Sequence, residues 1–275
     1  MAQIIEECTL PDGRRVYRAE APLDEQLKLF KEKGIRYPIS IRDMAYGRSN
    51  GKLMKGTRTC HAPIYAPNSE VVVAMVSPLV KNQELAEQAV QAHKENRWFV
   101  RSVKLYETFR EQAEIDKDKS PEKRRAVILP SRQTFYLGGD SYVSETLFRD
   151  MRERYFNDFA KREKLKFFLI PKGDVDSLPE DKCILNYLWF GSADYDSGVD
   201  GDRGLNCSSR AFGVSESAPK AHARKKLLPR VTSPYSPKQL AGSLKIVQGV
   251  RSGNLPALKL EKVVEFLAGL ENNKS

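Results

Sequence analysis

The sequence predicts a mixed α+β fold, in which a mixed or antiparallel sheet packs against several helices. Two observations favour this class. Near the start, the turn tripeptide Pro11-Asp12-Gly13 separates two short stretches that suit β-strands, a pattern typical of a hairpin. After the hairpin, strand-like and helix-like stretches alternate irregularly, which favours α+β or a mixed sheet over a doubly wound parallel sheet.

The first elements are punctuated by proline and glycine. Strands are expected at 4–9 and 14–18, followed by a helix at 22–33. Pro22 suits the first turn of that helix, and Gly34 suits its end. We therefore expect the chain to open with a hairpin and one helix.

The next stretch mixes irregular and periodic sequence. Residues 36–68 are expected to be mostly irregular because glycine and proline recur in them. The valine-rich run at 70–76 predicts a buried strand. Asn82 suits the cap of a helix that reaches about residue 95. The stretch 98–113 fits a helix, with a strand at 99–105 as the alternative.

Shorter strands and one longer helix are expected in the middle of the chain. Strands are predicted at 126–129 and 134–137, and a short one at 167–170. The stretch 183–190 suits either a strand or a short helix. Ser144 is expected to open a helix, because apolar residues then recur every four positions. These are Leu147, Met151, Tyr155 and Phe159.

The last third of the chain changes character. Residues 191–234 show almost no periodicity, and long irregular stretches of this kind are usually functional or mobile. Two final helices, near 236–247 and 257–270, predict a C-terminal helical hairpin. The predicted organisation therefore has three parts: a core domain at 1–190, an acidic-then-basic irregular segment at 191–235, and the helical hairpin at 236–275, packed on the core.

Composition limits the class of protein. Hydrophobic residues make up 40% of the chain and charged residues 30%, which is typical of a globular protein. Apolar runs stay well below the roughly 18 residues that span a bilayer, and the first residues lack the pattern of a secretory signal. The four cysteines lie far apart and suggest reduced thiols. We expect a soluble cytoplasmic protein without a membrane partner.

Positive charge is concentrated near the end of the chain. The net charge is +10, and residues 203–260 alone hold eleven basic residues against one acidic residue. Directly before them, residues 172–202 carry eight acids and two lysines. Charge clustered in this way repels itself unless a partner compensates it. The asymmetry therefore indicates a surface for a polyanion, since phosphate backbones are bound by dense positive charge.

The candidate phosphate contacts all lie in this basic region, and they do not distinguish RNA from DNA. They are Arg210, Lys220, Arg224, Lys225, Lys226, Arg230 and Arg251. Aromatic residues are sparse there, namely Phe212 and Tyr235, so a platform that stacks bases is not expected. A second basic cluster, at residues 42–58, is expected to be an exposed loop, with phosphate binding as the alternative because its glycines would let the backbone approach a phosphate. It contains Arg42, Arg48, Lys52, Lys55 and Arg58.

An acidic loop precedes the basic region. Carboxylates alternate with glycines there, a composition that suits a hard cation such as Mg²⁺ or Ca²⁺. The candidate ligands are Asp194, Asp196, Asp200 and Asp202. The loop lacks the spacing of an EF-hand, so a solvated acidic loop is the alternative. Nucleotide-binding motifs rich in glycine are absent from the sequence.

The sequence thus favours a nucleic-acid-binding protein over an enzyme, as a component of a nucleoprotein assembly, and no catalytic residue is assigned. One alternative is a metal-dependent enzyme that acts on a phosphorylated or nucleic acid substrate through the acidic loop. A second alternative is a structural subunit whose basic region docks an acidic protein partner. No cofactor beyond Mg²⁺ or Ca²⁺ is indicated.

Overall fold

The computed structural model describes residues 3–159, 164–193, 198–205 and 209–215. The chain divides into two compact units, residues 1–220 and 221–275, and every described residue belongs to the first. The predicted C-terminal helical hairpin lies outside the described residues. None of the helices in the described ranges combines the length and hydropathy needed to cross a bilayer.

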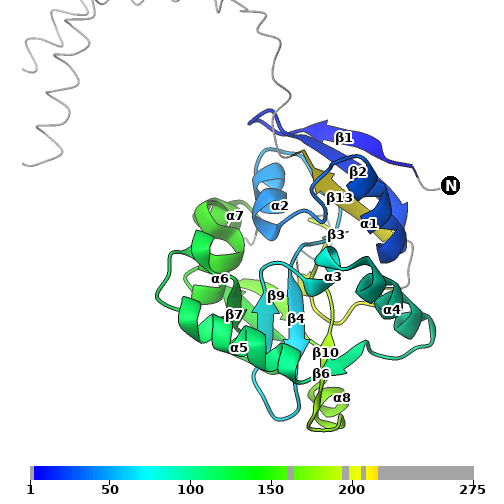
Figure 1. Cartoon of the computed structure of the whole chain (residues 1–275). Coiled ribbons are helices and arrows are strands. Elements are labelled where there is room, and N and C mark those ends of the chain that lie inside the picture. The colour runs from blue at the N-terminus through cyan, green and yellow to red at the C-terminus, as the bar shows by residue number, and fades with distance from the viewer. Residues whose placement is uncertain (1–2, 160–163, 194–197, 206–208, 216–275) are drawn as a thin grey trace, which may run out of the picture. The chain divides into compact units, whose positions relative to one another are not determined.

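Two sheets form the centre of the first unit, which confirms the α+β class (Figure 1). Within the described residues the larger sheet is mixed and has the order β1-β2-β13-β3-β11-β12-β9-β8. Its strands are β1 (Ile5–Thr9), β2 (Arg15–Ala21), β3 (Thr57–Arg58), β8 (Phe135–Gly138), β9 (Lys164–Phe168), β11 (Trp189–Phe190), β12 (Val199–Asp200) and β13 (Ser209–Val214). The antiparallel smaller sheet, of order β6-β10-β4-β5-β7, consists of β4 (Ala62–Tyr65), β5 (Val72–Ala74), β6 (Val100–Ser102), β7 (Ala126–Ile128) and β10 (Lys182–Leu185).

Helices cover both sheets. The longest helix of the described ranges, α5, packs on strands β5 and β7 of the smaller sheet, and α1 packs on α4 beside β2 (Figure 1). The helices are α1 (Leu23–Glu32), α2 (Ile41–Arg48), α3 (Pro78–Lys81), α4 (Gln83–Lys94), α5 (Lys104–Asp116), α6 (Tyr142–Phe148), α7 (Arg152–Asp158) and α8 (Lys172–Asp176), with short 3-10 turns at Pro121–Lys123 and Arg149–Met151.

Several predicted elements are confirmed, with the expected local cause. The opening hairpin forms, and Gly13 in its turn has a φ of 85°. Helix α1 ends before Gly34, which has a φ of 62°. Glycine adopts such left-handed angles without the strain that a Cβ would bring. The side chain of Asn82 accepts a hydrogen bond from the Leu85 amide and so caps α4.

The core lies on both faces of the central strands. In β13, Ala211 and Phe212 are both fully buried but belong to two different hydrophobic clusters. In β10, Ile184 likewise belongs to one cluster and its neighbours Cys183 and Leu185 to the other. Successive side chains of a strand point to opposite faces, so each of these strands separates two apolar layers.

Four predictions were wrong in part. Residues 36–68 hold helix α2, capped by the Ser40 side chain, and strands β3 and β4. The stretch 98–113 contains both alternatives in succession, first β6 and then α5. The helix expected from Ser144 begins at Tyr142 and breaks at Arg149, whose φ is 52°. Residues 191–234 include strands β12 and β13.

Strand β13 was missed because its cues depend on tertiary pairing. It contains Gly213, which a sequence pattern reads as a turn signal. In the sheet, a Cβ at this position would lie 2.7 Å from side-chain atoms of Ile35 and Phe30, so glycine lets α1 approach the strand closely. The segment 191–235, which was predicted to be irregular, therefore includes a strand in the interior of the larger sheet.

Candidate functional site

The structure describes only part of each predicted site. Of the seven candidate phosphate contacts, Arg210 lies at the start of β13. The other six, Lys220, Arg224, Lys225, Lys226, Arg230 and Arg251, lie outside the described residues. Of the four candidate metal ligands, Asp200 lies on β12 and Asp202 just after it, whereas Asp194 and Asp196 lie outside.

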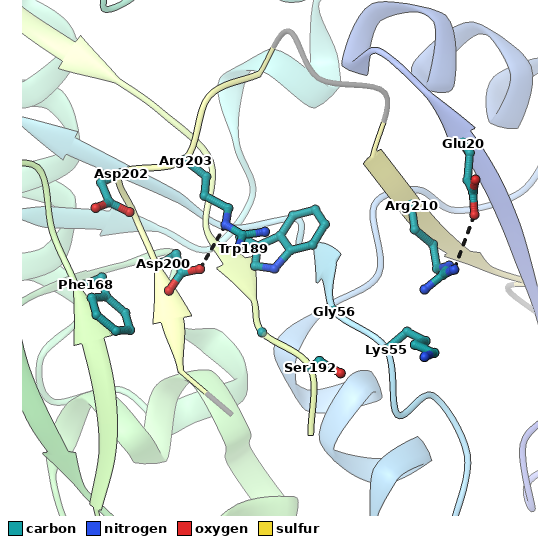
Figure 2. A pocket seen from close by; sticks show the side chains of 11 residues that line it. Glu20, Lys55, Gly56, Phe168, Trp189, Ser192, Asp200, Asp202, Arg203 and Arg210 are labelled. Atoms are coloured by element: carbon teal, nitrogen blue, oxygen red, sulfur yellow. Dashed lines mark ion pairs between the residues drawn. The ribbon is translucent and has the colours of Figure 1, made fainter. Parts of the chain in front are cut away.

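The described members of the two sets share one pocket. It has a volume of about 650 Å³ and is open to solvent (Figure 2). Its charged residues are Glu20, Lys55, Asp200, Asp202, Arg203 and Arg210. Its aromatic residues are Phe168 and Trp189, and Gly56, Gly191 and Ser192 complete the lining.

Six neighbouring strands of the larger sheet build this pocket. Arg210 on β13 is the register partner of Glu20 on β2. Trp189 on β11, Asp200 on β12 and Phe168 on β9 are register partners in one row. Residues opposite one another on adjacent strands share a face, so the row presents its side chains together. The chain enters β3, between these two groups, through Lys55 and Gly56.

The two ends of the pocket differ in charge (Figure 2). Lys55 and Arg210 lie on one side of Trp189, and Asp200 and Asp202 lie on the other. Arg210 Nη2 is 3.4 Å from Glu20 Oε1, and the buried Arg210 Nε lacks a hydrogen-bond partner among the described atoms. Within the same residues, the Lys55 ammonium forms no ion pair. Among the described residues, Lys55 is therefore the cation on this side without an ion-pair partner, whereas Arg210 is paired with Glu20.

Arg203 covers the Trp189 ring. Its guanidinium carbon lies 4.7 Å from the ring centre, and its Nε is 3.2 Å from Asp200 Oδ2. The Arg203 side chain is nonetheless 56% exposed. At exposed positions a cation–π contact is worth about 0.5–1 kcal/mol, and an ion pair about 0.2–1 kcal/mol. Arg203 is therefore held weakly over the ring.

The acidic side offers carboxylate oxygens but no assembled metal centre within the described ranges. No group of three or more His, Cys, Asp or Glu side chains there is placed to hold a metal ion. Asp200 is paired with Arg203, and burial raises the pKa of Asp202 above the ordinary value for aspartate. The predicted metal site stays a prediction, because two of its four carboxylates lie outside the described residues.

The second basic cluster is not the exposed loop that the sequence predicted. Arg48 and Arg58 are 0% and 2% exposed. The Arg58 guanidinium donates to the Gln26 side chain and to the Leu205 carbonyl, at 3.0 and 3.2 Å. Of the cluster, Lys55 is the member that lines the pocket.

Arg48 forms hydrogen bonds to the backbone of residues that line the pocket. Its guanidinium donates to the carbonyl oxygens of Lys55 and Gly191, which both line the pocket, and to the Leu53 carbonyl at 3.2 Å. It also stacks over the Phe190 ring, with its Cζ 4.1 Å from the ring centre. Arg48 therefore links the two chain segments that flank Trp189.

Whereas the first pocket has equal numbers of acidic and basic residues, a larger hollow elsewhere is lined mainly by acids. It has a volume of about 980 Å³ and lies beside α5. Its charged lining residues are Glu70, Glu107, Glu111, Glu114, Glu180 and a single arginine, Arg110. Arg110 Nε is 3.6 Å from Glu70. Such a lining repels polyanions, so size alone does not identify the site that fits a phosphate.

Sequence reasoning missed the aromatic part of the pocket. Trp189 and Phe168 lie 21 and 42 residues before Arg210 in the sequence, and only the strand order brings them beside it. An aromatic residue in a strand is usually read as core, so no local signal could have identified Trp189. No family model, curated protein or solved structure matches the chain.

Proposed function

We propose that the protein binds nucleic acid through its phosphates, as a component of a nucleoprotein assembly. The observation that carries this proposal is that Lys55 and Arg210 line the same solvent-open pocket. These residues come from two different basic clusters of the sequence, 155 positions apart. The other six predicted contacts, at residues 220–251, lie outside the described residues and stay predictions from the charge of the sequence.

Binding to labelled RNA and DNA oligonucleotides across a salt series tests this proposal. Counterion release demands that affinity falls steeply as salt rises, by about one unit of log–log slope per phosphate contacted. Changing Lys225 and Lys226 to Glu should weaken binding to all sequences alike. Absent or salt-independent binding would contradict the proposal.

A matched pair of variants locates the contact. Lys55→Ala combined with Arg210→Gln should weaken binding and lower the salt slope by about two. Arg110→Ala removes an arginine from the acidic hollow that is 51% exposed, against 28% for Arg210, and should leave binding unchanged. Equal losses per positive charge removed, two in the first variant and one in the second, would mean that only the overall charge matters.

The metal-dependent enzyme remains a second proposal, because Asp200 and Asp202 line the pocket that holds the candidate phosphate contacts. Calorimetric titration with Mg²⁺, Mn²⁺ and Ca²⁺ tests it, with Asp200→Asn combined with Asp202→Asn as the control. Absence of both heat and thermal shift would reject it. The third proposal, an acidic protein partner, predicts that a co-purifying protein survives nuclease treatment.

A further inference from the structure

A partly exposed tryptophan inside a charged pocket calls for an explanation. Trp189 lies in the sheet beside Asp200, and a Cβ at Gly56 would lie 2.9 Å from its indole nitrogen. Glycine at residue 56 thus lets the neighbouring strand approach the indole closely. The edge of the ring lies close to the backbone at Gly56, while the Arg203 side chain over its face is 56% exposed.

We infer that Trp189 stacks an unpaired base, so that the pocket binds single-stranded nucleic acid rather than duplex. This inference rests on the proposed function. Lys55 and Arg210 take the phosphate next to the stacked base. The pocket volume of about 650 Å³ lies within the range of about 300–1,000 Å³ that is usual for small ligands.

The chemistry of stacking gives the preference for single strands. Every base has a π-face that an indole can stack on, so the contact tolerates any sequence. In a duplex these faces are covered by the neighbouring base pairs, and a base must be unstacked before it can enter a pocket. A duplex would therefore contact Lys55 and Arg210 without reaching Trp189.

Arg203 can yield its place to a base. Two contacts hold the Arg203 side chain in place. Its guanidinium carbon lies 4.7 Å from the centre of the Trp189 ring, and its Nε lies 3.2 Å from Asp200 Oδ2. A base offers the indole a larger flat surface than a guanidinium does. Once displaced, the Arg203 cation is free to approach the phosphates of the same strand.

Tryptophan fluorescence tests the inference directly. The chain has two tryptophans, so Trp98→Phe leaves Trp189 as the sole reporter. Trp98 is a suitable site for this change because it is partly exposed and lies outside the pocket. We expect single-stranded oligonucleotides to quench the Trp189 emission, whereas heparin and a duplex of the same sequence bind with little quenching.

The binding affinity of Trp189 variants gives the second readout. Trp189→Ala should weaken single-strand binding by about 5- to 150-fold, the range measured for loss of one stacked base, and leave duplex binding unchanged. Trp189→Phe should retain most of the single-strand affinity because a smaller aromatic face remains. A thermal melt of each variant separates lost stacking from lost folding.

The outcomes separate the two levels of the proposal. If no polyanion binds with a salt-dependent affinity, the proposed function fails. If oligonucleotides bind but Trp189 emission is unchanged and Trp189→Ala binds like the parent, the base-stacking inference alone is overturned. Equal quenching by heparin would also overturn it, since heparin has no bases.

Discussion

Two groups of basic residues in the same part of the fold differ in what surrounds them. Arg48 and Arg58 are almost completely buried and donate to backbone carbonyls and a glutamine. Lys55 and Arg210 line a solvent-open pocket nearby, and Arg210 is 28% exposed. The first group stabilises the fold from inside it, whereas the second lines a pocket that a ligand can enter. Net charge counts both groups equally, so burial decides which charges can serve binding.

Of the substitutions that test this comparison, loss of Arg48 should change stability most. Arg48→Met keeps the stem but removes the donors to three carbonyls. Each carbonyl left buried without a partner costs about 1–3 kcal/mol, so the free energy of unfolding should fall on the order of 3 kcal/mol. Urea unfolding measures it, with the exposed Arg110→Met as the control. A change below that of the control would show that Arg48 is not structural.

The buried His61 should make stability depend on pH. Its Nδ1 donates to the Met75 carbonyl at 2.9 Å and its Nε2 accepts from the Ile41 amide at 3.3 Å, so the neutral tautomer is required. Burial lowers its pKa to about 4. Stability is therefore complete above the unfolded pKa of about 6.5 and is lost as pH falls towards 4, by up to about 3 kcal/mol.

Urea unfolding at a series of pH values checks this window. His93, whose pKa burial also lowers to about 4, contributes in the same direction. His61→Asn should be less stable than the parent at neutral pH but show a shallower loss in acid. An unchanged slope would mean that His61 does not titrate in this range.

Replacement of Lys55, unlike that of Arg48, should weaken nucleic acid binding and leave stability almost unchanged. Lys55→Ala removes an ammonium that makes no ion pair with any described residue. Thermal stability should stay within about 0.5 kcal/mol of the parent, while the salt slope of nucleic acid binding falls by about one. Binding isotherms at several salt concentrations measure the slope. A stability loss as large as that of Arg48→Met would show that Lys55 also stabilises the fold.

Asp202 should give the smallest effect. Burial raises its pKa, so its carboxylate opposes folding at neutral pH, and the opposition disappears below the unfolded pKa of about 3.9. Asp202→Asn should therefore raise the melting temperature slightly at pH 7 and have no such effect in acid. A lower melting temperature at pH 7 would indicate that the carboxylate has a stabilising partner.

Local sequence predicted the elements whose cause is local. The hairpin turn at Gly13, the stop at Gly34 and the cap at Asn82 each depend on residues within a few positions. Strand β13 depends instead on pairing with β2, almost 200 residues earlier. The helix break at Arg149, whose φ is 52°, interrupts a stretch whose apolar residues keep their spacing of four. Periodicity carries neither kind of information.

The candidate site was predicted in the same partial way. Arg210, Asp200 and Asp202 were identified from charge clustering, and the structure brings them into one pocket. Trp189 was not identified, because it lies in the apolar stretch 183–190, away from the charge clusters, and Lys55 was noted only as part of a cluster expected to be an exposed loop. Stacking was not expected, since the basic region itself contains few aromatic residues.

The sequence by itself determined the mixed α+β class and the position of the positive charge along the chain, because composition and short-range periodicity are read directly from it. Only the tertiary structure decided which basic residues are buried and which meet solvent. The strand order β13-β3-β11-β12 places Arg210, Lys55, Trp189 and Asp200 around one pocket. That order depends on contacts between distant segments, which no local pattern records.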